Sequence, residues 1–408
     1  MQNLKKGDPQ IYQIIKKEEE RRDTTLEMIP SENHTSHAVL EALSTVLSDK
    51  YAEGYPKKRY YGGNEHIDEV EMLCQERAKE LFNVPYANVQ GYSGSPANHA
   101  VYFALAEPGE KVMGMNLLSG GHLTHGWKVN FSGKYYDSVF YGVDKETMLI
   151  DYDEVREVAL KEKPKIIFCG ATAYPRIIDF KRFREIADEV GAYLCADISH
   201  IAGLVVAGVH PDPSPYAHVI TTTTHKTLRG PRGAVIMVTQ SGIKKDEKIT
   251  EKIDKAVFPG LQGGPHENQI AAIAVCLKEA TDPSFTAYAK QIVNNCRKLS
   301  EELQKRDFHI VSGGTDNHLL LIHLSDMGGS EAQKMLEENG IMVNKNAIPF
   351  DENPPFNPSG IRLGTPAITT RGMKEKEMEE IASLISKALS GEKVREEVKA
   401  LCAKFPLL

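Results

Sequence analysis

The 408-residue sequence has few cysteines, no excess of basic residues and no long apolar run. Its six cysteines are scattered and form no Cys-x-x-Cys pair, which argues against a disulfide framework and against a cysteine metal site. The formal net charge of −7 favours neither a nucleic acid nor an anionic membrane as a partner. No uninterrupted apolar stretch approaches the roughly 20 residues of a membrane-spanning helix. We therefore predict no metal site, no nucleic acid and no membrane partner.

The first 22 residues are too charged to form the apolar centre of a signal peptide. Charged residues make up 26% of the chain and hydrophobic residues 41%, as in ordinary globular proteins. The chain exceeds the size at which a single core stops growing, so more than one domain is expected. The composition thus predicts a cytoplasmic, multidomain protein with reduced and mostly buried thiols.

The pattern of apolar residues divides the chain into three parts. Residues 8–23 are typical of an amphipathic helix, and we predict an N-terminal helical arm over residues 1–30. A large domain is predicted over residues 31–280 and a small C-terminal α+β domain over residues 281–408. A helical segment, 268–306, would connect these two domains.

Four short apolar runs inside the large domain read as buried strands, and a helical pattern at 180–190 lies between the first two. The runs are 165–169, 192–196, 218–222 and 234–238. Strands that alternate with helices predict an α/β fold, with a mostly parallel sheet covered by helices on both faces. In such sheets ligands bind beyond the carboxyl ends of the strands.

The segment 221–233 carries one lysine, Lys226, between a buried strand with a threonine cluster and a Gly/Pro/Arg turn. An ammonium group at the end of a buried strand is costly unless it is neutralised or used covalently. A lysine that forms a Schiff base needs this setting, with hydroxyl groups nearby for a phosphate. The alternative is an ordinary surface lysine in a polar loop.

Asp197 ends the strand before the lysine segment and strengthens the Schiff-base interpretation. Pyridoxal phosphate acts as an electron sink when an anion keeps its pyridine nitrogen protonated. An aspartate at the end of one strand and a lysine after the next can face the same cofactor. A helix N-cap or a structural ion pair is the commoner role of such an aspartate.

The order of motifs along nearly the whole chain resembles the serine hydroxymethyltransferase family. The motifs are Ser31–Asn33, Tyr60–Gly63, Ser93–Ser95, Gly120–Gly126, Asp197 with His200–Gly203, the lysine segment, Phe258–His266, Asn344–Asn346 and Gly360–Thr365. The resemblance implies a fold-type-I pyridoxal-phosphate enzyme that works as an obligate homodimer with shared active sites.

The resemblance implies a role for each matching residue. Lys226 would hold pyridoxal 5'-phosphate as an internal aldimine, Asp197 would pair with the pyridine nitrogen, and His122 would stack on the ring. The other implied cofactor residues are Ser93, Gly94, Ser95, Thr172, His200, Thr223 and His225, with Tyr51, Gly263 and Gly264 reaching the phosphate of the partner subunit.

The implied reaction transfers the hydroxymethyl carbon of L-serine to tetrahydrofolate and gives glycine and 5,10-methylenetetrahydrofolate. Arg362 would clamp the substrate carboxylate with help from Ser31, because a guanidinium matches two carboxylate oxygens in a plane. Glu53 and Tyr61 would act at the hydroxymethyl group, and His225 would flank the lysine. The implied folate residues are Glu53, Leu117, Gly121, His122, Leu123, Asn346, Pro354, Pro355 and Phe356.

Two other hypotheses use much of the same sequence. A folate-independent aldolase of β-hydroxy amino acids, or an α-methylserine hydroxymethyltransferase, would keep the lysine, aspartate and arginine and differ in the second substrate. A silent paralogue that binds folate or RNA is disfavoured by the intact Lys226, Asp197 and Glu53. Positions that depart from the family pattern are Tyr92, Pro96, Ser119, Thr172, Ser199 and Pro354.

Overall fold

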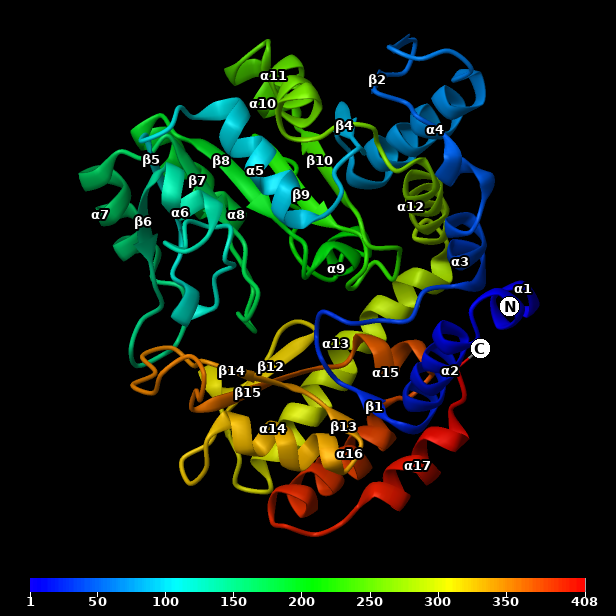
Figure 1. The fold of residues 1–408 in the computed structure, drawn as a ribbon. Helices are drawn as coiled ribbons and strands as arrows, with labels where there is room; N and C mark the ends of the chain where they lie inside the picture. The colour runs from blue at the N-terminus through cyan, green and yellow to red at the C-terminus, as the bar shows by residue number, and fades with distance from the viewer. Residues whose placement is uncertain (408) are drawn as a thin grey trace.

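The computed structural model describes residues 1–407 and is built around a seven-stranded sheet (Figure 1). The strands lie in the order β4 (Tyr86–Asn88), β10 (Ala234–Val238), β9 (Val219–Thr223), β8 (Tyr193–Asp197), β7 (Ile166–Cys169), β5 (Lys111–Met115) and β6 (Asp137–Tyr141). The five strands from β9 to β6 are parallel to one another. The predicted α/β class with a mostly parallel sheet is confirmed.

Alternate residues of the central strands enter two separate cores, one on each face of the sheet. Ile167 of β7 belongs to a core with α4 (Glu65–Phe82), α7 (Tyr152–Glu162), α8 (Phe180–Val190) and α12 (Glu267–Glu279). Ile166 belongs to the opposite core, with α5 (Gly94–Leu105) and α11 (Ile249–Lys255). Because both faces are covered, these strands are apolar throughout instead of alternating with polar residues.

The four strands and the helix at 180–190 that the sequence predicts are present as β7, β8, β9, β10 and α8. β10 is an exception within this mostly parallel sheet, because it runs antiparallel to both of its neighbours. Only residues 224–233 connect β9 to β10, which is too short for the crossover that a parallel pair requires. Lys226 lies in this tight connection.

A second sheet of four strands forms the C-terminal part of the chain. Its order is β11 (His309–Ile310), β12 (Leu319–His323), β15 (Gly360–Gly364) and β14 (Asn344–Asn346). Its core includes residues of α13 (Pro283–Gln304), α14 (Gly329–Glu338), α16 (Glu375–Leu389) and α17 (Arg395–Lys404). The proposed domain boundary near residue 280 falls between α12 and α13.

The segment after the N-terminal arm packs with this second sheet, although it is far away in sequence. β1 (Leu26–Glu27) pairs in parallel with β13 (Ile341–Met342), and Leu26 and Met28 are fully buried in the C-terminal core. The remaining elements are α3 (His37–Leu43), β2 (Gly54–Tyr55), β3 (Lys58–Arg59), α6 (Phe131–Tyr135), α9 (Ala202–Val206), α10 (Gln240–Lys245), α15 (Pro366–Thr370), three short 3-10 helices at 46–49, 117–119 and 311–313, and a π-helical segment at 256–261.

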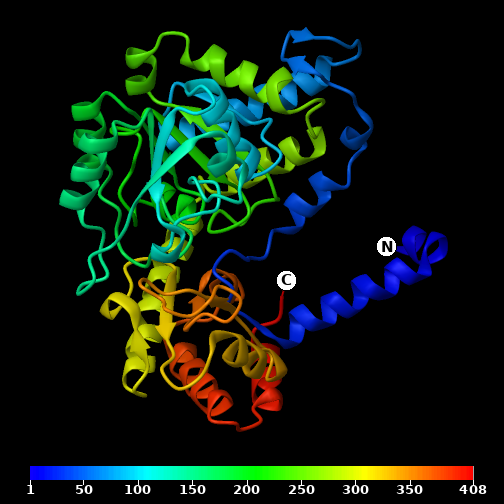
Figure 2. The same cartoon turned by 60° about the vertical axis from the view of Figure 1, so that its left-hand side comes forward.

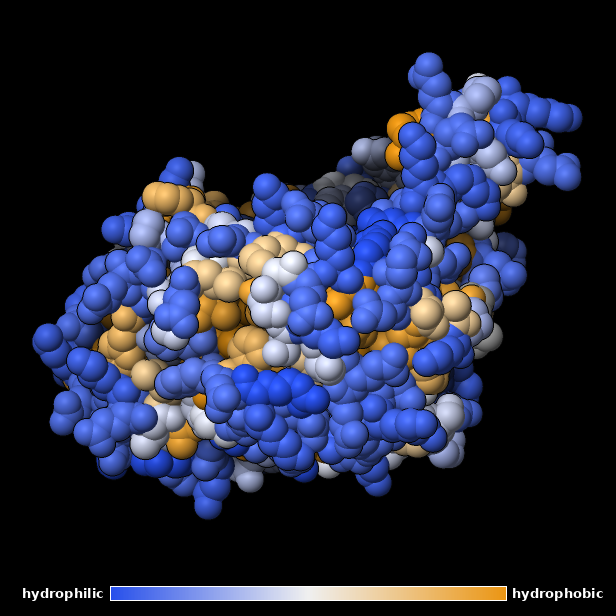
Figure 3. All heavy atoms as spheres, turned by 90° about the horizontal axis from the view of Figure 1, so that it is seen from below, coloured by the Kyte–Doolittle hydropathy of each residue, from blue (hydrophilic) through white to orange (hydrophobic). Residues whose placement is uncertain are grey.

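The N-terminal arm consists of α1 (Gln2–Gly7) and α2 (Pro9–Thr24) and extends away from the body of the chain (Figure 2). Neither helix has a buried residue, and Ile11 and Ile14 are 46% and 60% exposed. The projecting arm is largely hydrophilic, with apolar side chains open to its surroundings (Figure 3). Among residues 1–407, no helix has the length and apolar character needed to cross a membrane.

Candidate active site

A cavity of about 160 Å³ lies at the carboxyl ends of β7, β8 and β9, where the fold predicts a ligand. Residues from these strand ends, from the start of α5 and from the β9–β10 connection line it: Ser93, Gly94, Ser95, Asn98, His122, Ala171, Thr172, Asp197, Ser199, His200, Thr223, His225, Lys226 and Arg232. Ten of the residues that the sequence predicts for the cofactor therefore surround one cavity.

Lys226 places its amine in this cavity. Its Nζ donates a hydrogen bond to Oγ1 of Thr223, 2.9 Å away. The pKa of Lys226 is lowered to about 8, mainly by burial; the nearby cations Arg362 and Arg232 act in the same direction, and Asp197 acts in the opposite one. The amine is therefore neutral for part of the time near physiological pH, as a nucleophilic lysine must be.

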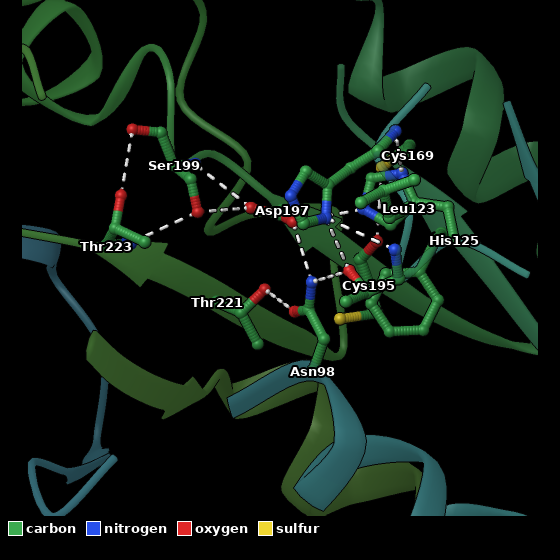
Figure 4. Close-up of polar contacts among 12 residues, drawn as sticks. Asn98, Leu123, His125, Cys169, Cys195, Asp197, Ser199, Thr221 and Thr223 are labelled. Carbon is green, nitrogen blue, oxygen red and sulfur yellow. Dashed lines mark hydrogen bonds and ion pairs between the residues drawn. The ribbon is translucent and has the colours of Figure 1, made fainter. Parts of the chain in front are cut away.

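Asp197 lies at the end of β8 inside a shell of hydrogen-bond donors (Figure 4). Its Oδ2 accepts from Asn98 Nδ2 at 2.8 Å and from His125 Nε2 at 3.0 Å. Its Oδ1 accepts from the backbone N–H and the hydroxyl of Ser199, at 3.1 and 2.6 Å. Although burial opposes ionisation, the bonds from His125 and Ser199 and the neighbouring imidazoles hold the pKa of Asp197 well below its usual range. The cavity thus contains a permanent buried anion.

The N-terminus of α5 faces the same cavity. Ser93 is the N-cap residue and makes no side-chain capping bond, so the first N–H groups of the helix remain available to a ligand. An added Cβ at Gly94 would lie 2.6 Å from Cγ2 of Thr223, so only glycine lets the helix come this close to β9. Free N–H groups and the positive end of the helix dipole suit a phosphate.

Three histidines line the cavity, and two of them, His122 and His225, are neutral for the same reason. Burial lowers the pKa of His122 to about 4 and that of His225 to about 3. Nδ1 of His122 lies 2.7 Å from the hydroxyl of Thr124, which fixes the ring. Nδ1 of His225 is buried and has no partner among residues 1–407. Neutral imidazoles present flat faces that can stack on an aromatic ligand.

His122, His125 and Asp197 also bring ligand atoms within 4.8 Å of one another, a spacing that a metal ion can use. These atoms already take part in hydrogen bonds: His125 Nε2 donates to Asp197, and His122 Nδ1 bonds to Thr124. We therefore assign the group to hydrogen bonding: His125 holds the carboxylate of Asp197, and Thr124 holds the ring of His122.

Arg362, on β15, lies beside the lining residue Thr172 but is not itself part of the cavity lining, and it is buried without a counter-ion among residues 1–407. Its Nη1 donates to the backbone oxygen of Thr172 at 2.6 Å, and its Nε donates to Oδ1 of Asn344 at 3.0 Å. Burial lowers its pKa to about 10, and within residues 1–407 no carboxylate forms an ion pair with it. A buried cation with unused donors requires an anion from outside the chain, and a guanidinium suits a carboxylate.

Five other predicted residues gather outside the cavity, and we call them the Tyr51 cluster: Tyr51, Glu53, Tyr61, Gly263 and Gly264. The rings of Tyr51 and Tyr61 lie 4.9 Å apart, and both side chains are exposed. A Cβ added at Gly263 would lie 3.4 Å from Oε1 of Glu53, and a Cβ added at Gly264 would lie 3.7 Å from the ring of Tyr51. Both glycines are therefore close to these side chains. None of the five belongs to the cavity lining among residues 1–407.

The residues predicted for folate also lie outside the cavity lining, except for His122. Leu117 and Gly121 lie in or beside the single-turn helix 117–119, and Leu123 is 45% exposed. Asn346 ends β14. Pro354, Pro355 and Phe356 are exposed in the loop between β14 and β15. Ser31 lies in the turn after β1 and likewise does not line the cavity, so its role stays a prediction.

Sequence reasoning missed three polar residues that line the cavity. Asn98 lies one helical turn after Gly94, and it links the carboxylate of Asp197 to the hydroxyl of Thr221. Ser199 donates twice to Asp197, and Arg232 adds a positive charge near Lys226. Helical spacing from the Ser93–Ser95 turn was the available signal for Asn98.

The lining residues fit pyridoxal phosphate. Lys226 supplies an amine with a lowered pKa, Asp197 a buried anion for a protonated ring nitrogen, and the start of α5 a site for the phosphate. His122 offers a neutral ring for stacking, and the orphaned Nδ1 of His225 offers a further polar contact. These are the groups that the cofactor requires.

The comparison with protein families agrees with this chemistry. The family model described as serine hydroxymethyltransferase matches residues 4–385, which is almost the whole chain. The match includes both sheets, the cavity, Arg362 and the Tyr51 cluster. The chain belongs to the serine hydroxymethyltransferase family.

Proposed function

We propose that this member of a fold-type-I pyridoxal-phosphate transferase family moves the hydroxymethyl carbon of L-serine to tetrahydrofolate, reversibly, and produces glycine and 5,10-methylenetetrahydrofolate. The observation that carries the proposal is the meeting of three groups: the low-pKa amine of Lys226, the ionised Asp197 and the unpaired cation of Arg362. Together they can bind the nitrogen and carboxylate of an amino acid beside a cofactor.

The residues of the cavity divide the chemistry among them. Lys226 would hold pyridoxal phosphate, which supplies the electron-withdrawing ring that stabilises charge at the substrate Cα when its bond to Cβ breaks. Asp197 would keep the proton on the ring nitrogen, because its own pKa is far below neutrality. Arg362 would fix the substrate carboxylate and so orient the bond that breaks. The lowered pKa of Lys226 lets its amine accept and return a proton.

The resemblance assigns the proton transfers at the hydroxymethyl group to Glu53 and Tyr61, and neither residue lines the cavity of a single chain in the described part. Glu53 and Tyr61 have suitable groups, but they lie in the exposed Tyr51 cluster. In a symmetric dimer the same surface of each chain faces its counterpart. We propose that the Tyr51 cluster of one subunit completes the cavity of the other.

The surface of the chain supports this homodimer. Tyr60, beside the cluster, is 75% exposed, and Tyr51 and Tyr61 are 55% and 47% exposed. The N-terminal arm adds the exposed Ile11 and Ile14 on a helix that makes few contacts with its own chain (Figure 2). Exposed aromatic and aliphatic groups of this kind are typical of subunit interfaces.

An absorption and product experiment tests the proposed function. The purified protein with pyridoxal phosphate is expected to have a visible band, and glycine with tetrahydrofolate together should produce a new band at longer wavelength. Carbon-labelled L-serine should yield glycine only when tetrahydrofolate is present. Folate-independent cleavage, with a glycine spectrum that ignores folate, would instead indicate the aldolase. A protein that cannot be reconstituted with pyridoxal phosphate would rule out both enzymes.

Shared sites predict that two inactive variants complement each other. A heterodimer of a Lys226→Ala chain and a Glu53→Gln chain, isolated through two different affinity tags, should contain one intact site. It is expected to show about half of the wild-type turnover per dimer, while each parent homodimer stays inactive. If Glu53 served the cavity of its own chain, the heterodimer would be as inactive as its parents. A doubly tagged wild-type dimer is the control.

The lowered pKa of Lys226 predicts how its reactivity depends on pH. In the cofactor-free protein, the rate at which an acylating reagent modifies Lys226 should rise about fivefold from pH 7 to pH 8 and level off above pH 9. This follows because only the neutral amine reacts, and it is half populated near pH 8. Mass spectrometry of the modified peptide measures the rate. A rate that keeps rising through pH 10 would show an ordinary lysine.

A further inference from the structure

His200 and His318 form a buried pair that joins the two sheets of the chain. His200 follows Asp197 and β8 of the large sheet, and His318 immediately precedes β12 of the small sheet. Nδ1 of His200 lies 3.1 Å from Nε2 of His318, and the ring planes are inclined by 30° with centroids 5.3 Å apart. Both side chains are buried, at 5% and 0% exposure.

The two rings are neutral, so their hydrogen bond has a definite donor. Burial lowers the pKa of His200 far below its ordinary value, and it lowers that of His318 to about 3. The cations Lys226 and Arg362 act in the same direction on both rings. A neutral imidazole carries a single N–H, so one ring must donate and the other accept.

The surroundings of His318 decide which ring donates. Nδ1 of His318 is buried and has no partner among residues 1–407. A buried N–H without an acceptor is rarer and more costly than an unused lone pair, so the proton of His318 belongs on Nε2. His318 then donates to Nδ1 of His200, and His200 must carry its own proton on Nε2. That nitrogen is left for a group in the cavity, which His200 lines.

The backbone around His318 is firmly held in place. Its carbonyl accepts from the N–H of Thr365 at 3.1 Å. The preceding Asn317 accepts from the N–H of Leu319 at 3.1 Å and donates to the carbonyl of Tyr174, in the large-sheet part, at 3.0 Å. Because β12 pairs with β15, the sheet that presents Arg362 also presents His318. The position of the His318 ring therefore depends on contacts with the large-sheet part of the chain.

We propose that His318 is a positioning residue that fixes His200 as its Nε2–H tautomer, so that His200 offers a hydrogen-bond donor to the cofactor bound in the cavity. The proposal deepens the proposed function and rests on it for the identity of the acceptor. Partners of this kind set which nitrogen of an imidazole is protonated. At metal sites, the loss of such a partner of a ligating histidine typically weakens metal binding or activity about 10- to 100-fold.

Two substitutions separate the hydrogen bond from mere packing. His318→Gln keeps an N–H donor close to the position of Nε2, whereas His318→Met fills a similar space without one. We expect His318→Met to weaken cofactor binding about tenfold, as measured by the release of pyridoxal phosphate on dilution. His318→Gln should stay within about threefold of the wild type. Equal losses in both variants would reduce the role of His318 to packing and overturn the proposal.

A measurement on the cofactor-free wild-type protein keeps the test independent of activity. Histidine-selective ¹⁵N labelling distinguishes the two tautomers by the nitrogen shifts, and the His200→Asn variant assigns the signals of His200. The expected result is an Nε2–H tautomer at His200 that is lost in His318→Met. A wild-type His200 protonated on Nδ1 overturns the proposal. If the tautomer is as expected but the protein has no folate-dependent activity, the proposed function fails instead.

Discussion

Replacement of Lys226 by alanine is expected to lower the turnover of serine by about 10³-fold or more while the fold is retained. Losses of this size are typical when an enzyme loses the group that forms its covalent link. The side chain makes a single hydrogen bond, from Nζ to Thr223, so little structure depends on it. Folate-dependent formation of glycine measures the turnover, and the visible absorption of the cofactor bound to lysine should disappear with it.

Stability and chemical rescue serve as controls for this variant. The lowered pKa of Lys226 shows that the folded chain disfavours the ammonium form, so near pH 7 the alanine variant should unfold at the same temperature as the wild type or a higher one. A small external amine should restore part of the turnover, because the space of the side chain is open to the cavity. A variant that keeps more than about a tenth of the activity would show that the cofactor needs no link to Lys226.

The sequence predicted the central strands because a strand buried on both faces is recognisable as a short run of apolar residues. β7, β8, β9 and β10 are short runs without a charged residue until Asp197 ends β8. β4, β5 and β6 were missed, and each of them departs from that pattern. β4 has three residues, β5 contains Gly114, and β6, at the edge of the sheet, begins with Asp137 and Ser138. Short and edge strands carry a weaker periodic signal.

The positions of Lys226 and Asp197 followed from the same strands, since Asp197 ends β8 and Lys226 lies in the short connection after β9. Their environment did not follow, because it depends on contacts between distant parts of the chain. Asn98 reaches Asp197 across 99 positions. His125 reaches the same carboxylate across 72 positions. Periodicity describes one element at a time and holds no information on such contacts.

The proposed role of Glu53 and Tyr61 rests on the proposed homodimer. Both residues have the chemistry that the resemblance requires, yet one chain places them in the exposed Tyr51 cluster. A single sequence does not indicate which surface of the folded chain contacts a second copy of it. The complementation of Lys226→Ala by Glu53→Gln therefore tests the part of the site that neither the motif nor the fold of a single chain can supply.

Replacement of Arg362 by leucine is expected to raise the KM for serine by about 10²- to 10³-fold. This corresponds to the roughly 2–5 kcal/mol that is lost when one partner of a buried charge pair is removed. In the wild-type chain the guanidinium is held by Thr172 and Asn344, and it has no carboxylate partner among the described residues. Steady-state kinetics with serine measure the change. The KM of Arg362→Lys for serine should lie between those of the wild type and of Arg362→Leu, since an ammonium cannot hold two oxygens in one plane.

Thermal unfolding separates lost binding from a damaged fold. Glycine should raise the unfolding temperature of the wild-type protein, because it binds only the folded state, and it should leave that of Arg362→Leu unchanged. A substrate analogue without a carboxylate, such as ethanolamine, completes a thermodynamic cycle. If Arg362 acts on the carboxylate, the substitution should weaken the binding of serine strongly and that of ethanolamine only slightly. Ethanolamine has no carboxylate, so its complex with the wild-type protein already lacks the interaction. Equal losses with both compounds would mean that Arg362 supports the cavity through Thr172 and Asn344 instead, and that the carboxylate binds elsewhere.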